Sequence, residues 1–263
     1  MATLLAELWR TVADRSAAGA APAPSFRESV AAERRALSSD ESRSFWSERL
    51  RGAPFARLPR TAPEAPGARP RAGLHEVPIP GELLAALSAV ASRAGVPVKS
   101  VLLAAHLRMV SVLCAEPDVV TGLVTSTRPE EEGAEGALGL FLNTVPLRVA
   151  IGEGSWIDLV RAAFAAEVET LPHRSFPMAE IQRATGGRPL FEAVFNYVHF
   201  HVEDSLSGVP GLAHRGSASR ASTNFSLFVH FERAPGGGGM RIAFDCDERV
   251  ADRGRVESIA QAY

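Results

Sequence analysis

The most informative polar residue in the sequence is Asn143, whose side chain carries an amide. Asn143 and Thr144 follow a glycine-containing apolar turn at residues 138–142 and open an alternating segment, typical of a buried strand, that runs through Arg148 and ends near residue 151. Burying a side-chain amide without partners costs roughly 1–3 kcal/mol. Either the backbone of the turn satisfies Asn143 or a ligand does, and the sequence leaves both interpretations open.

Two arginines and one histidine are further candidates. Arg128 begins an acidic loop, where a solvated loop end is one interpretation. Arg148 lies toward the end of a predicted strand, where a structural ion pair is the favoured interpretation. His173 stands between two prolines, a setting more typical of a residue that braces a turn than of a general base.

A metal site is a weaker possibility. His199 and His201 share one face of a strand predicted over residues 193–202, and His230 lies on a later strand. No carboxylate completes a ligand set at diagnostic spacing, so we expect no metal. A serine hydrolase is excluded by the lack of a G-x-S-x-G turn, and no glycine-rich phosphate loop precedes a helix.

Composition narrows the class of protein. The 263 residues are 46% hydrophobic, enough to form one large domain or two small ones. The net charge is -2, and Lys99 is the only lysine, so nothing favours nucleic acid or an anionic membrane as a partner. Cys114 and Cys246 are too few for a disulfide framework or a zinc site, and we expect reduced thiols in a cytoplasmic protein. No apolar run approaches the roughly 18 residues of a membrane span.

The N-terminal part is predicted to be helical. Residues 1–14 place apolar side chains on one stripe, and helices are predicted over residues 25–36 and 39–50. Five prolines then interrupt residues 52–73, which indicates a linker. We therefore expect a helical part at 1–51, a proline-rich linker at 52–73 and a main lobe at 74–263.

Strands and helices alternate through the main lobe and give way to consecutive strands. The strands are predicted over 75–79, 118–126, 143–151, 193–202, 224–231 and 240–245, and the helices over 83–94, 100–114, 155–171 and from 253 onward. The glycine run 236–239 is typical of a hairpin turn. This order predicts an α/β two-layer sandwich, a mixed β-sheet covered by helices.

Five places give the chain a family resemblance. Residues 138–148 (LGLFLNTVPLR) match the motif I-G-x-F-x-N-T-x-x-x-R almost letter for letter, and residues 173–178 (HRSFPM) are similar to H-Q-D-x-P-F with three departures. Residues 25–30 followed by 45–52 (FWSERLRG) are similar to an aromatic-Trp helix, and residues 188–196 (RPLFEAVFN) to an R-x-P-L-F-x-x-x-F segment. Arg128 occupies the position of the family's arginine in the loop after a strand. The chain thereby resembles the C-terminal lobe of a nonribosomal peptide synthetase condensation domain, with trailing N-lobe helices, in the chloramphenicol-acetyltransferase-like fold.

The resemblance implies roles for individual residues. The family's H-H-x-x-x-D-G motif, whose second histidine assists attack of an acceptor amine on a donor thioester, is absent from the sequence, and we expect the chain to begin just past it. No catalytic residue is therefore assigned. Arg128 would pair with the aspartate of that motif. The other candidates, Asn143, Arg148, His173, Phe191 and Asn196, would line the substrate tunnel or brace the lobe.

The resemblance also implies a function and partners. The intact family makes amide bonds between acyl and aminoacyl thioesters tethered to carrier proteins by phosphopantetheine arms, without a directly bound cofactor. The expected partners are carrier proteins and the missing N-lobe or adjacent synthetase domains, and the fragment alone is expected to be inactive. The alternatives are a non-catalytic module that binds a carrier protein or a partner lobe, and an acyltransferase of the same fold with another base.

Overall fold

The computed structural model describes residues 12, 26–60, 72–130, 134, 137–198, 223–233, 239–248, 250 and 253–263. The helix predicted over residues 1–14 lies outside this part of the chain except for residue 12, as do the end of the strand predicted to run to residue 202 and most of the glycine run.

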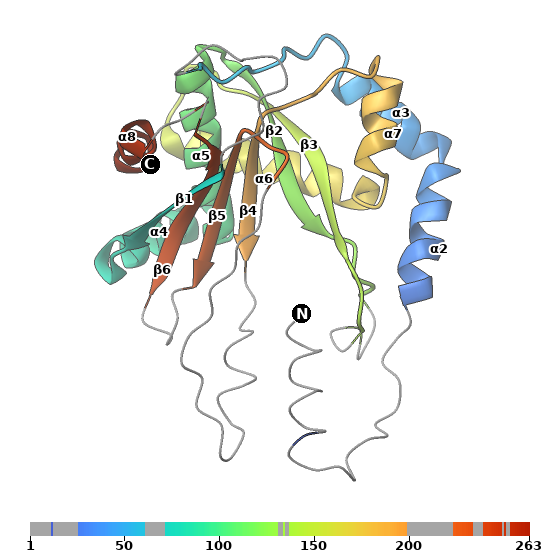
Figure 1. The fold of residues 1–263 in the computed structure, drawn as a ribbon, viewed down its shortest axis with the longest axis horizontal. Coiled ribbons are helices and arrows are strands. Elements are labelled where there is room, and N and C mark those ends of the chain that lie inside the picture. Colours follow the sequence, from blue (N-terminus) through green and yellow to red (C-terminus); the bar gives the residue numbers. More distant parts are fainter. Residues whose placement is uncertain are drawn as a thin grey trace.

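The described residues form one six-stranded sheet (Figure 1). The strands are β1 (Ala72–Ile79), β2 (Asp118–Ser126), β3 (Leu142–Ala150), β4 (Ala193–Val198), β5 (Leu227–Arg233) and β6 (Met240–Asp247), in the order β1-β6-β5-β4-β2-β3. β4 pairs in parallel with both β2 and β5, and the other pairings are antiparallel. The sheet is therefore mixed, which confirms the predicted fold class.

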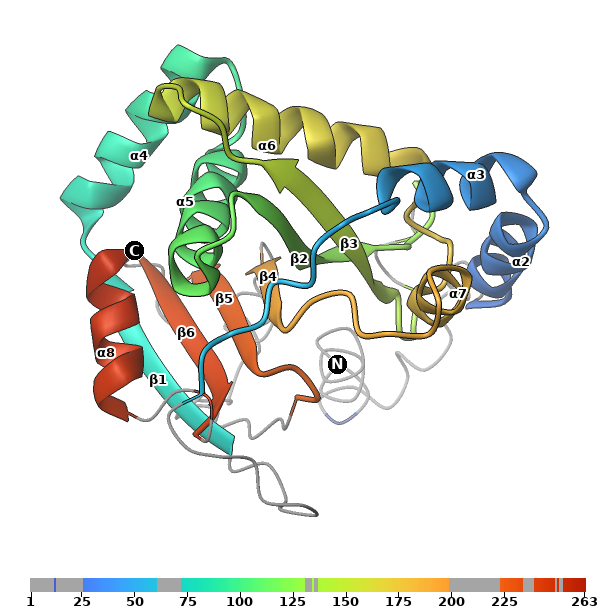
Figure 2. The same cartoon turned by 90° about the horizontal axis from the view of Figure 1, so that it is seen from above.

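The helices divide into two groups, which Figure 2 shows from above. α5 (Val98–Cys114), α6 (Trp156–Thr170) and α8 (Arg253–Ala262) pack on one side of the sheet, and α4 (Gly81–Ala94) packs on α5 and α6. α2 (Phe26–Leu37), α3 (Asp40–Arg49), the 3-10 turn η3 (Leu171–His173) and α7 (Met178–Ala184) gather beside β3. The core lies between the first group and the sheet.

Local chemistry fixes several element ends. Ser155 caps α6 in a reciprocal capping box with Asp158, as its position predicts. Gly95 ends α4 in the left-handed conformation with φ 72°. β5 begins three residues later than predicted because the Thr223 hydroxyl accepts a hydrogen bond from the Phe225 N–H, and the ladder starts only where the Leu227 N–H reaches the Glu192 carbonyl.

The division at residues 52–73 stays a prediction. α3 inserts Trp46, which is 1% exposed, into the same core cluster as the sheet residues. Residues 53–60 then cross above the sheet toward β1 (Figure 2). Within the described residues, no single helix is long and apolar enough to cross a membrane, although the bent pair α4 and α5 passes that test together by length and composition.

Candidate functional site

Asn143 lies near the start of β3 and its amide is fully engaged by backbone. Nδ2 donates to the carbonyls of Arg174 (2.8 Å) and Phe176 (2.9 Å), and Oδ1 accepts from the Thr144 N–H (2.9 Å). The open question of what satisfies this amide is thus answered by backbone of the segment after η3 and of its own strand. Asn143 fastens that segment to the sheet.

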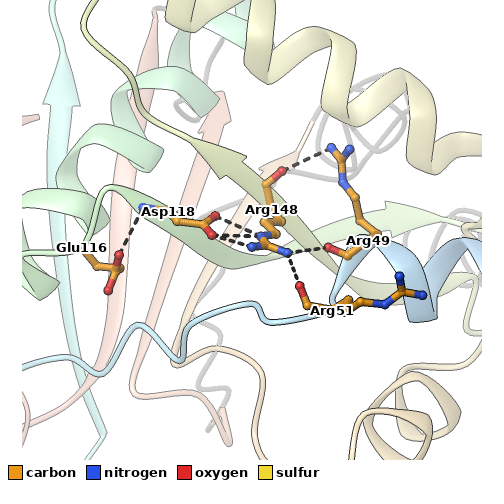
Figure 3. Close-up of polar contacts among 5 residues, drawn as sticks. All are labelled: Arg49, Arg51, Glu116, Asp118 and Arg148. Carbon is orange, nitrogen blue, oxygen red and sulfur yellow. Dashed lines mark hydrogen bonds and ion pairs between the residues drawn. The ribbon is translucent and has the colours of Figure 1, made fainter.

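Arg148 connects two strands to the end of α3 (Figure 3). Its Nε and Nη2 donate to the carboxylate of Asp118 on β2, and its Nη1 donates to the carbonyls of Arg49 (3.1 Å) and Arg51 (2.9 Å). Arg49 returns a hydrogen bond to the Arg148 carbonyl (3.2 Å). The hydrogen bonds to Asp118 raise the pKa of Arg148. The guanidinium of Arg148 therefore places a positive charge at the C-terminal end of α3, where it donates to carbonyls that the helix leaves unpaired.

Arg128 shapes the loop that follows β2. Its Nη1 donates to the carbonyls of Ala134 and Ala137, and its guanidinium carbon lies 4.0 Å from the centre of the Phe141 ring. The side chain is half-buried rather than a solvated loop end. It borders a cleft of about 770 Å³ between α2, residues 127–130 and residues 171–175, where Arg174 pairs with Glu130 at 2.6 Å.

His173 is buried at the end of η3 and contacts α3. Its Nδ1 lies 2.9 Å from the Ser42 hydroxyl, and its ring stacks on Phe45 with centroids 4.1 Å apart. Burial lowers the pKa of His173, with Glu41 opposing the shift. His173 and Asn143 thus act on the same short segment. His173, at its start, contacts Ser42 of α3, and Asn143 donates to the carbonyls of Arg174 and Phe176.

Phe191 lies just before β4, and Asn196 lies within it. Phe191 packs against Gly122 of β2, where an added Cβ would come within 2.4 Å of the ring, so only glycine fits there. Asn196 places Nδ2 3.1 Å from Nδ1 of His230 on β5. His199 and His201 lie outside the described residues. Among the residues that the structure does describe, no three His, Cys, Asp or Glu side chains are grouped to hold a metal ion.

Two polar networks were missed from the sequence. Glu192, the residue before β4, makes a two-pronged ion pair with Arg60 and accepts a hydrogen bond from the Leu58 N–H, which holds residues 58–60 at the start of that strand. On the other side of the sheet, fully buried His106 bonds Tyr263 (2.7 Å) and Thr121 (2.8 Å). The histidine interrupting the apolar pattern of α5 was the available signal, whereas nothing local indicated the partner of Glu192.

The candidates do not converge on one reactive centre. Two hydroxyl–imidazole pairs, Ser42 with His173 and Thr121 with His106, occur in the described part of the chain, and all four side chains are buried. The remaining candidates bind backbone, a carboxylate or a neighbouring ring. The hydrogen bonds of these candidates therefore connect loops, strands and helices of the protein. Among the described residues, none of the candidates is arranged as a general acid or base for a substrate.

Comparison with known proteins identifies relatives over almost the whole chain. A family model described as "Condensation domain" matches residues 2–262. The chain is 38% identical over 245 residues to AMB antimetabolite synthetase AmbE of Pseudomonas aeruginosa, covering 92% of the chain and 11% of AmbE. It is 29% identical over 244 residues to the ferrichrome siderophore peptide synthetase of Mycosarcoma maydis, covering 89% of the chain and 6% of that protein. The chain thus spans a small part of these relatives.

Solved structures share the fold. The first condensation domain of the CDA synthetase superposes with a TM-score of 0.76 at 20% identity, over 99% of the chain and 58% of that structure. The X-domain from teicoplanin biosynthesis superposes with a TM-score of 0.77 at 19% identity, over 99% of the chain and 63% of that structure. The mixed sheet with its helices is thus the chloramphenicol-acetyltransferase-like fold predicted from the sequence.

Proposed function

Because the chain belongs to the condensation-domain family, we propose that it is part of a nonribosomal peptide synthetase condensation domain, which joins carrier-bound acyl and aminoacyl thioesters through an amide bond. The observation that carries this proposal is the family match over residues 2–262, with the Asn143 motif at its centre.

Within that domain we assign these residues to a supporting role. Asn143, Arg148 and His173 use their hydrogen bonds on backbone, a carboxylate and a serine, so they hold the lobe rather than move protons. The sequence contains no H-H-x-x-x-D-G motif. The proposal is that the 263 residues alone do not condense substrates, with residues 74–263 as the C-terminal lobe, 52–73 as a linker and 1–51 as trailing N-lobe helices.

The partners follow from the same proposal. Carrier proteins would deliver both substrates on phosphopantetheine arms, and adjacent synthetase domains or an N-lobe would supply the histidine motif. The relatives are far longer than the matched region, which supports neighbouring domains in the same assembly. We place the protein in the cytoplasm, where such thioesters are made.

The test joins the chain to an upstream segment that carries H-H-x-x-x-D-G. Amide formation between an acyl-loaded and an aminoacyl-loaded carrier protein is measured by mass spectrometry. We expect product from the fusion, none from the chain alone, and a large loss when the second histidine of the added motif is changed to alanine. A well-folded fusion without product would count against the function.

A non-catalytic binding module is the second candidate. It is favoured by the cleft beside α2, whose lining includes Arg35, Arg128 and Arg174 from three segments, together with Glu28 and Glu130. Titration of a phosphopantetheinylated carrier protein onto the isolated chain separates the two, because saturable binding together with an inactive fusion would support the binding module.

A further inference from the structure

Asp245 on β6 is a largely buried carboxylate that accepts no hydrogen bond from the described residues. The residue is 7% exposed. Its oxygens are not among the side-chain atoms that are both fully enclosed and unpaired, so they keep some contact with solvent. A carboxylate that is reachable and unpaired can accept a hydrogen bond from a ligand.

Strand alternation places Asp245 on the face of the sheet opposite α5 and α8. The neighbouring Phe244 packs on Tyr263, with ring centroids 5.5 Å apart, and Tyr263 bonds His106 of α5. Because successive side chains of a strand point to opposite faces, Asp245 points away from these helices. On that face the register sets Phe228 directly opposite Asp245.

His230 lies two residues further along β5, on the same face. Asn196 donates through Nδ2 to Nδ1 of His230, so the neutral ring carries its proton on Nε2. Nε2 has no hydrogen-bond partner in the described part of the chain. The ring of His230 lies 4.1 Å from that of Phe228. An acceptor, a donor and an aromatic face thus stand side by side on β5 and β6.

Arg241, a cation on the same face of β6, is already engaged by two carboxylates. Arg241, also on β6, donates to Glu232 at 2.8 Å and lies 3.3 Å from Glu76. Asp245 is therefore not paired by the arginine of its own strand. His230 and Asp245 occupy diagonal positions on adjacent antiparallel strands. Two residues in such positions are about 7–8 Å apart. A small polar group can bridge such a gap with one hydrogen bond to each side.

We propose that Asp245, His230 and Phe228 form a subsite for the amine-bearing acyl group, in which Asp245 accepts from the amine, His230 Nε2–H donates to the carbonyl oxygen and Phe228 contacts the side chain. The inference rests on the proposed function, in which one substrate is an aminoacyl thioester. Asn196 is then a positioning residue, since it orients the His230 ring.

The electrostatics agree with this assignment. Burial raises the pKa of Asp245, so an amine that approaches it restores an interaction that the carboxylate lacks. Burial also lowers the pKa of His230, against the opposing influence of Glu232, which keeps the ring neutral and able to donate from one nitrogen.

A matched pair of small probes tests the subsite on the full chain. L-phenylalaninamide carries the amine, the carbonyl and an aromatic ring, whereas 3-phenylpropanamide differs only by lacking the amine. Each is titrated by NMR while backbone amide shifts of β5 and β6 are followed. We expect L-phenylalaninamide to bind about tenfold more tightly than 3-phenylpropanamide, and Asp245→Asn to remove that difference.

Controls make each outcome decisive. Glu153→Gln changes an exposed acid in the loop between β3 and α6, at the other end of the sheet from β5 and β6, and should leave the ratio unchanged. Equal affinity for the two probes on the unmodified chain, or an unchanged ratio in Asp245→Asn, would overturn the subsite, and the first comparison holds even if the variant does not fold. Neither measurement needs a carrier protein or a catalytic base. An inactive fusion with intact probe discrimination would therefore reject the proposed function and leave the subsite standing.

Discussion

Arg148 on β3 and Asp118 on β2 form a two-pronged ion pair, with Nε 3.0 Å from Oδ1 and Nη2 2.6 Å from Oδ2. The remaining nitrogen of the same guanidinium donates to the carbonyl of Arg49, the last residue of α3, and to that of Arg51 just beyond it. A single planar cation therefore joins two strands and one helix, and this geometry depends on the fork of arginine rather than on its charge alone.

Arg148→Lys should destabilise the fold although it keeps the charge. One ammonium cannot reach Asp118 and both carbonyls together, so we expect the free energy of unfolding to fall by about 1–3 kcal/mol in urea titrations. Arg183→Lys is the control, since its pair with Glu180 within α7 is exposed, and should change stability by less than about 0.5 kcal/mol. Equal effects of the two variants would show that charge alone matters at Arg148.

Asn143→Asp should loosen the segment after η3. The substitution turns a donor that faces the Arg174 and Phe176 carbonyls into an acceptor, so we expect a loss of about 1–3 kcal/mol and faster amide hydrogen exchange over residues 174–181. Gln182→Glu, which loses only an exposed 3.3 Å bond to Gly187, serves as the control. Unchanged exchange in Asn143→Asp would favour a ligand-binding role for the amide instead.

Gly122→Ala should be destabilising through overpacking. The added methyl would meet Phe191 and Val194 within 3 Å, and we expect a cost of about 1–3 kcal/mol in thermal or urea unfolding. The double variant Gly122→Ala, Phe191→Leu should recover part of that loss because the smaller side chain vacates the contact. Additive losses in the double variant would argue against the contact as the cause.

His106 should make stability depend on pH. Burial lowers its pKa from 6.5 to about 3, so between these values the unfolded chain binds a proton that the native chain does not. Its contribution is complete above pH 6.5 and is lost as pH falls, with a slope of up to about 1.4 kcal/mol per pH unit. Urea titrations from about pH 4.5 to 7.5 should give a shallower slope for His106→Gln than for the unchanged chain.

The comparison for this pH series is His75→Gln, which changes a histidine on the edge strand β1. We expect it to keep the slope of the unchanged chain. If the two histidine variants have the same slope, the network of His106, Tyr263 and Thr121 does not control the acid sensitivity of the fold.

Within the described residues, the sequence by itself determined most of the helices and strands to within a few positions, because each of them rests on local periodicity and on residues close along the chain. The alternation of helices and strands also predicted the mixed sheet. Ser155 as the cap of α6 and Gly95 as the end of α4 belong to this group, since a cap and its helix are neighbours.

Only the tertiary structure decided which groups face one another. Ser42 meets His173 across 131 positions, and Arg148 meets Arg51 across 97. Likewise, no sequence pattern indicates that Asp245 lies unpaired beside His230, because that depends on strand order and register. The physical reason is that hydrophobic spacing selects which face of an element is buried, whereas the partner of a polar group is selected by how distant elements pack.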